Sequence, residues 1–126
     1  MSFALTQIGQ ISVNVHDIDR AVAFYRDTLG MKHLFSAGKM AFFQCGEIRL
    51  MLAIPEKPEF DYPSSILYYK VPDIDGAAAS LSATGVRFES KPHLVARMPT
   101  HELWMAFFRD SEQNLLSLMC EKPLPS

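Results

Sequence analysis

The chain contains one sequence pattern twice. Residues 15–23 (Val-His-Asp-Ile-Asp-Arg-Ala-Val-Ala) return as residues 71–79 (Val-Pro-Asp-Ile-Asp-Gly-Ala-Ala-Ala), 56 positions later. A second match, Met-Ala-Phe-Phe, occurs at 40–43 and again at 105–108, 65 positions later. Two half-length copies of one supersecondary unit predict a pseudo-symmetric domain with its site between the halves. They are too few to stack as a solenoid.

The composition suits one globular domain and argues against two classes of partner. The chain has 126 residues, of which 48% are hydrophobic and 21% charged. A net charge of −2 offers no basic surface to nucleic acid, and no apolar run reaches the length of a membrane span. Residues 1–10 lack the pattern of a secretory signal, so Cys45 and Cys120 are expected to stay reduced. We therefore expect a cytoplasmic protein with no nucleic-acid or membrane partner.

Local patterns predict the same order of elements in both halves. In the first half, residues 8–15 alternate as in a half-buried strand, and Asp17 is placed to cap a helix from about 18 to 29. In the second half, Asp73 is placed to cap a helix from about 74 to 83. The remaining strands are expected at 31–36, 39–45, 48–54, 65–71, 86–89, 103–109 and 114–120.

These patterns predict an α+β fold of two βαβββ modules. The segment between them, 55–63, contains three prolines and cannot form the interior of a strand, so it is expected to be a linker. We expect a single domain over residues 1–126, with module one at about 5–54 and module two at about 64–121.

The second half is longer than the first between its helix and its repeated strand. Gly30 and Met40 are 10 positions apart, whereas Gly85 and Met105 are 20 apart. The additional residues fall within 92–102. Long connections in compact domains commonly serve as lids or binding loops, so this segment is expected to be a loop near the site.

Two segments carry a resemblance to a known family. The stretches 23–31, which opens Ala-Phe-Tyr and closes Leu-Gly-Met, and 108–114 (Phe-Arg-Asp-Ser-Glu-Gln-Asn) resemble the vicinal oxygen chelate superfamily. This superfamily includes glyoxalase I, extradiol dioxygenases and the bleomycin and fosfomycin resistance proteins. The resemblance covers 8–120, although 110–114 departs from the family's Asp-Pro-Asp-Gly-Asn turn, and 93–108 resembles an uncharacterised branch of small glyoxalase-like proteins. It implies a cup-shaped mixed sheet around a ligand cavity, and a homodimer.

The resemblance also implies where a metal would bind. Metal-dependent members use four side chains, from the first and last strands of each module, and these positions correspond here to Gln10, Met51, Ile66 and Ser117. Ile66 has no lone pair, and the thioether of Met51 suits soft ions. Open catalytic sites need about three protein ligands, so we expect no metal at these positions, no cofactor and no glyoxalase I activity.

The same strand positions predict a binding surface. Residues two apart on a strand share a face, so Ser12 and Asn14 accompany Gln10, Arg49 accompanies Met51, and Tyr68 and Lys70 accompany Ile66. We expect an apolar pocket with polar edges, whose positive charge suits a carboxylate or phosphate. The alternative is that Arg49 and Lys70 are solvated at its rim. The expected ligand-binding residues are Gln10, Ser12, Asn14, Arg49, Tyr68, Lys70, Arg97 and Trp104.

The additional segment supplies candidate catalytic residues. If the chain turns at Pro99, then His93, His101 and Glu102 approach one another and form an acid–base cluster or a displaced site for a divalent metal. The alternative is that these side chains only hold the segment in place or cover the cavity.

Three functional hypotheses follow, and the sequence leaves open whether the chain is an enzyme. The first is a glyoxalase- or bleomycin-resistance-like protein that binds a small organic ligand, with an anion favoured, and lacks the usual metal site. The second is a lyase, isomerase or dioxygenase of the same superfamily with a displaced metal at His93, His101 or Glu102. The third is a resistance protein that sequesters a drug.

Overall fold

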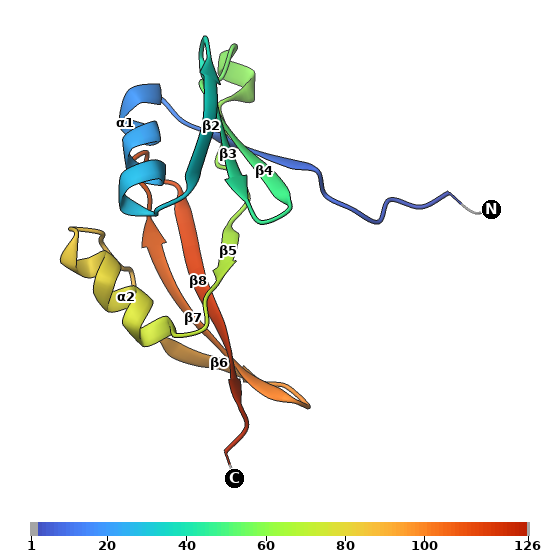
Figure 1. The fold of residues 1–126 in the computed structure, drawn as a ribbon, viewed down its shortest axis with the longest axis vertical. Coiled ribbons are helices and arrows are strands. Elements are labelled where there is room, and N and C mark those ends of the chain that lie inside the picture. The colour runs from blue at the N-terminus through green and yellow to red at the C-terminus, as the bar shows by residue number, and fades with distance from the viewer. Residues whose placement is uncertain (1–2, 126) are drawn as a thin grey trace. The chain divides into compact units, whose positions relative to one another are not determined.

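The computed structural model describes residues 3–125, and the chain divides after Ser64 into two units (Figure 1). Each unit is a four-stranded mixed sheet with one α-helix on it. The strand orders are β1-β4-β3-β2 and β5-β8-β7-β6, so in both units the first strand pairs in parallel with the last. The predicted α+β class and the two βαβββ modules are therefore confirmed.

The elements of the first unit follow the predicted order. A π-helical turn, η1, continues the first helix, and a 3-10 turn, η2, lies in the proline-containing segment. The bounds are β1 (Gln10–Asn14), α1 (Ile18–Ala23), η1 (Phe24–Thr28), β2 (Lys32–Ala37), β3 (Met40–Cys45), β4 (Ile48–Ala53) and η2 (Pro58–Phe60).

The second unit repeats this order with longer strands at its end. The bounds are β5 (Leu67–Lys70), α2 (Ile74–Ala83), β6 (His93–Arg97), β7 (His101–Arg109) and β8 (Leu115–Pro123). Within residues 3–125, no helix is both long enough and apolar enough to span a bilayer.

The repeated Val-x-Asp-Ile-Asp pattern forms the start of each helix. Asp17 and Asp73 have extended backbone, and the Oδ1 atom of each accepts a hydrogen bond from the backbone N–H three residues later, at 3.0 Å in both cases. Such a cap satisfies one of the N–H groups that a helix start leaves without a partner. At the other end, Gly30 and Gly85 have φ values of +73° and +94°, a region that favours glycine.

Each sheet buries one face against its own helix. In the first unit α1 contacts β3 and β4, and in the second α2 contacts β7 and β8. Alternate strand residues point to this face, as the period of a strand requires. The buried residues include Val13, Leu50, Leu52, Phe43 and Tyr25 in the first unit, and Ile74, Ala106, Phe108, Leu116 and Leu118 in the second.

The strand registers of the two units correspond position by position. Met51 lies opposite Ser12 on β1 and Phe42 on β3. Ser117 lies opposite Tyr68 on β5 and Phe107 on β7. The alignment of the two halves that the sequence repeat predicts, with Met51 matched to Ser117, is the one that the sheets adopt.

The segment expected to be a loop at 92–102 is instead mostly strand, and that prediction was wrong. It forms β6 and the start of β7, so β7 and β8 are nine residues long where β3 and β4 are six. The strand predicted at 86–89 is reduced to a bridge between Phe88 and Phe108. β7 thus keeps backbone hydrogen bonds to 87–89 near its end and pairs with β6 nearer its start, and the extra residues lengthen a hairpin.

Candidate functional site

The first candidate surface is the face of the first sheet that α1 does not cover. Arg49 and Gln10, which lie side by side on β4 and β1, are both exposed there. The Nε atom of Arg49 donates to Oε1 of Gln10 at 2.7 Å, and the guanidinium carbon lies 5.6 Å from the centre of the Phe42 ring. Phe42 in turn stacks on Phe35, with ring centres 4.6 Å apart. This face therefore presents one oriented cation beside an aromatic surface.

The other polar side chains expected on this face have different environments. Ser12 is exposed, as predicted. The side-chain amide of Asn14 donates to the carbonyl oxygens of Phe60 and Tyr62 at 2.9 and 3.0 Å, and its backbone N–H donates to Ser64 Oγ at 3.1 Å. Asn14 thus holds the segment after β4 against the sheet.

The second candidate surface is the equivalent face of the second sheet. A carboxylate, that of Glu121, joins two basic groups there: Oε1 lies 2.6 Å from Lys70 Nζ, and Oε2 lies 2.9 Å from His101 Nε2. On the other side of the imidazole, Thr100 Oγ1 lies 3.0 Å from His101 Nδ1. Tyr68 lies edge-on to Phe107 on the same face, with ring centres 6.0 Å apart.

The electrostatic surroundings of Glu121 favour its ionised form. The hydrogen bond from Lys70 lowers the pKa of Glu121 below its ordinary value, and the positive charge of Lys70 acts in the same direction. The same bond raises the pKa of Lys70. The sequence patterns missed Glu121 because they ended the last strand at residue 120, whereas β8 continues to Pro123.

Glu102 lies on the opposite face from His101, because consecutive residues of a strand point to opposite sides. It is 8% exposed, and its carboxylate accepts hydrogen bonds from Arg97 Nε at 3.2 Å and from Trp104 Nε1 at 3.1 Å. Lys122 Nζ lies 4.0 Å from the centre of the Trp104 ring. Arg97 and Trp104 thus both contact Glu102, on the side of the sheet that faces α2.

The structure does not bring the predicted cluster of His93, His101 and Glu102 together. The chain does turn between β6 and β7, but the register places His93 opposite Met105. Met105 is four residues from His101, or about 13 Å along a strand. His93 Nδ1 lies 2.9 Å from the carbonyl oxygen of Lys91. Within residues 3–125, no three His, Cys, Asp or Glu side chains are grouped so that they would hold a metal ion.

The side chains at the four positions where the resemblance places a metal do not fit a metal ion. Gln10 is bonded to Arg49, and its Nε2 lies 3.8 Å from Met51 Sδ. Ser117 is fully buried, with its hydroxyl 2.8 Å from the carbonyl oxygen of Leu118, and Ile66 has no ligand atom.

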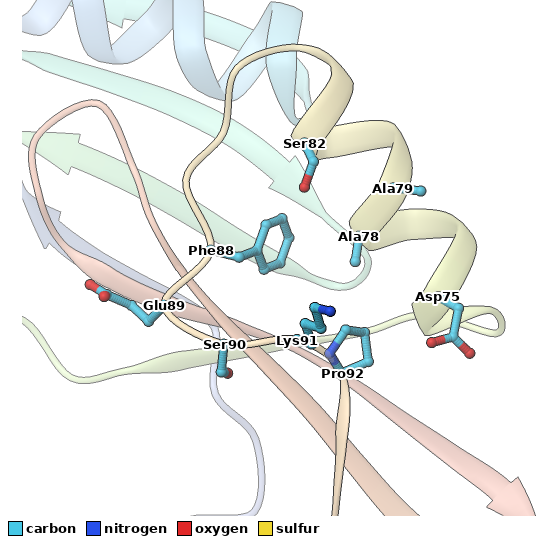
Figure 2. A pocket seen from close by; sticks show the side chains of 9 residues that line it. All are labelled: Asp75, Ala78, Ala79, Ser82, Phe88, Glu89, Ser90, Lys91 and Pro92. Atoms are coloured by element: carbon cyan, nitrogen blue, oxygen red, sulfur yellow. The ribbon is translucent and has the colours of Figure 1, made fainter.

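A third feature is a groove of about 480 Å³ on the second unit, between α2 and the segment that follows it (Figure 2). Figure 2 shows Phe88 directed from this segment toward Ala78. The groove exists where α2 carries small residues such as Ala78, Ala79 and Ser82, which the run of alanines in the sequence already signals. Asp75 at one end is bonded to Lys122 at 3.2 Å.

The fold consists of two units of βαβββ topology, and in each unit the first strand pairs in parallel with the last. A comparison with family models identifies the class of protein to which this fold belongs. Residues 7–118 match the model of the Glyoxalase/Bleomycin resistance protein/Dioxygenase superfamily. The chain therefore belongs to this superfamily, which confirms the resemblance found in the sequence.

Individual relatives agree with this assignment. The uncharacterised protein YraH of Bacillus subtilis is 29% identical, over 86% of this chain and 94% of its own length. Among solved structures, an integron cassette protein of Vibrio cholerae superposes with a TM-score of 0.79 at 18% identity, covering 95% of this chain and 98% of that one. A lactoylglutathione lyase of Agrobacterium tumefaciens superposes with a TM-score of 0.73 at 22% identity, covering 92% and 94%. At these identities the structural matches establish the fold.

Proposed function

We propose that this protein binds a small organic anion on the exposed face of its first unit, with Arg49 holding the carboxylate or phosphate of the ligand. The observation that carries the proposal is the hydrogen bonding of the Arg49 guanidinium group. Arg49 uses Nε to bond Gln10, and no carboxylate of residues 3–125 forms an ion pair with it. Its terminal amino groups can therefore donate two parallel hydrogen bonds to an incoming anion.

The neighbours of Arg49 support an organic ligand rather than a bare ion. Gln10 fixes the orientation of the guanidinium before a ligand arrives, which reduces the entropy lost on binding. Phe42 and Phe35 offer stacked aromatic surface on the same face, suited to the apolar part of a small molecule. The four positions where the resemblance places a metal carry side chains that do not fit one, so the proposed binding uses no metal.

The test compares anionic and neutral aromatic probes. Phenyl phosphate, benzoate and uncharged benzyl alcohol would be titrated against the protein while NMR shifts of the β3 and β4 amides are recorded. We expect Arg49→Gln to weaken binding of the two anions by about 10-fold to 100-fold, since a hydrogen bond to a charged group contributes about 1.5–3 kcal/mol.

Arg26→Gln is the matched control, because Arg26 is an exposed arginine already paired with Asp27 at 2.8 Å. Equal binding of phenyl phosphate by the wild type and by Arg49→Gln would contradict the proposal. So would preferred binding of benzyl alcohol over both anions.

We also propose that the protein works as a homodimer. Members of this superfamily commonly bind small molecules and dimerise. In the extended segment before β1, Phe3 and Leu5 are 89% and 90% exposed. A second copy of the chain that covered these apolar side chains would remove them from water, and this would stabilise the dimer. Analytical ultracentrifugation is expected to give twice the mass of the chain, and a monomer at high protein concentration would refute this.

A further inference from the structure

The second unit holds a hydroxyl, an imidazole and a carboxylate in sequence. Thr100 Oγ1 is 3.0 Å from His101 Nδ1, and His101 Nε2 is 2.9 Å from Glu121 Oε2. The other oxygen of Glu121 is held by Lys70 at 2.6 Å. A nucleophile within hydrogen-bond reach of a base, which is itself oriented by a third group, is the arrangement that activates hydroxyl nucleophiles.

The carboxylate determines which imidazole nitrogen carries the proton. An ionised Glu121 only accepts hydrogen bonds, so the neutral His101 ring donates to it through Nε2–H. Nδ1 then has a lone pair and accepts the hydrogen bond of the Thr100 hydroxyl. Lys70 keeps Glu121 in place and balances its charge, so the direction of the proton relay is fixed by contacts within one unit.

The relay is accessible to a substrate. Thr100 is exposed in the turn between β6 and β7, and the His101 side chain is 25% exposed. Leu103 lies opposite Glu121 in the sheet, on the same face as His101 and two residues from it, and Met105 follows. An acyl group attached to Thr100 would therefore have apolar side chains along the same face.

We propose that Thr100, His101 and Glu121 form an acyl-transfer site for activated esters of small carboxylic acids. Thr100 Oγ1 attacks the carbonyl carbon while its proton passes to His101 Nδ1. The bond between that carbon and the leaving oxygen breaks, and the oxygen departs with the electron pair and takes the proton from the imidazolium. Water then attacks the acyl carbon, with His101 Nδ1 taking its proton. The bond between that carbon and Thr100 Oγ1 breaks, Oγ1 takes the proton back from the imidazolium, and the acid is released.

The test uses p-nitrophenyl acetate as the probe. Release of p-nitrophenol is followed by absorbance, and the acetylated residue is identified by mass spectrometry of peptides from protein quenched in acid. We expect the acetyl group on Thr100, and a fall in the rate of about 100-fold in Thr100→Val and in His101→Gln. After subtraction of the reaction of imidazole itself with the ester, added imidazole should restore part of the rate in His101→Gln, which a merely structural role of this residue would not produce.

Two variants serve as matched controls. His33→Gln removes a histidine that is bonded to a serine hydroxyl at 2.9 Å, and Thr84→Val removes a threonine that donates to a backbone carbonyl oxygen at 2.7 Å. Both should react as the wild type does. Glu121→Gln should fall between the wild type and His101→Gln, because it removes the charge that orients the ring. Acetylation at Lys70 or elsewhere instead of Thr100, or an unchanged rate in His101→Gln, would overturn the proposal.

Discussion

Glu102 illustrates how a side chain with the chemistry of a catalytic residue can serve stability. Its carboxylate is almost buried and accepts hydrogen bonds from Arg97 and Trp104. Glu102→Ala would leave the Trp104 N–H and the Arg97 guanidinium without this acceptor. We expect the free energy of unfolding in urea to fall by about 1–3 kcal/mol.

The control for this change is Glu89→Ala. Glu89 also pairs with an arginine, Arg109 at 2.7 Å, but its side chain is 51% exposed. Exposed ion pairs contribute less than about 1 kcal/mol, so this variant should unfold close to the wild type. A loss in Glu89→Ala as large as that in Glu102→Ala would contradict the structural role assigned to Glu102.

Glu121 should make the protein sensitive to acid. Its pKa is lower in the folded chain than its ordinary value of 4.5, chiefly because Lys70 donates a hydrogen bond to it. A lowered folded-state pKa contributes stability above the ordinary value, and this contribution is lost as the pH falls through the folded pKa. The urea midpoint of the wild type should therefore fall more steeply below pH 4.5 than that of Glu121→Gln.

For each variant, the urea midpoint at low pH is compared with the midpoint of the same variant at neutral pH. Glu56→Gln changes an exposed glutamate of the segment after β4 and should follow the wild-type curve. Parallel acid profiles of the wild type and Glu121→Gln would show that the carboxylate has no such role.

At the scale of elements, the two helix caps are expected to contribute equally. Asp17→Ala and Asp73→Ala each remove a side chain that accepts from a helix N–H at 3.0 Å. Each should lower the free energy of unfolding by about 1 kcal/mol. Asp19→Ala is the control, because Asp19 lies in the first turn of α1 without being the cap. A larger loss in Asp19→Ala than in Asp17→Ala would show that charge rather than capping stabilises the helix start.

The elements were largely predictable because their signals are local. Alternation, the capping aspartates and the glycines after each helix predict where chains of this kind turn and pair. The length of 92–102 carries no such information, since ten extra residues can form a loop or lengthen two strands. Once this segment is strand, alternation alone separates His101 from Glu102.

The partners of the site residues were harder to predict. Arg49 and Gln10 meet because β1 and β4 pair in parallel, a register that the repeat supports. His101 and Glu121 meet through β8, whose last residues lie beyond the repeated pattern. Contacts between distant strands depend on register, and a shift of one residue would place either side chain on the other face.

At the scale of the molecule, each unit has a hydrophobic core of its own. Phe43 is fully buried in the first unit, and Phe108 is buried in the second. Replacing a buried phenylalanine by alanine costs about 3–5 kcal/mol. We expect Phe43→Ala to accelerate amide hydrogen exchange in β1 to β4 more than in β5 to β8, as measured by mass spectrometry.

Phe108→Ala should show the opposite pattern, with faster exchange in the second unit. The two variants thus serve as controls for one another. Equal acceleration across both units in both variants would show that the cores unfold as a single cooperative block.

The added length of the second unit has a consequence for where this chain tolerates insertions. β6 is an edge strand of its sheet, and the additional residues lengthen β7 and β8 without interrupting the parallel pair of β5 and β8. The chain can therefore gain or lose residues at 98–100 while the pairing of β5 with β8 is preserved. This turn is therefore a natural place to graft a foreign peptide.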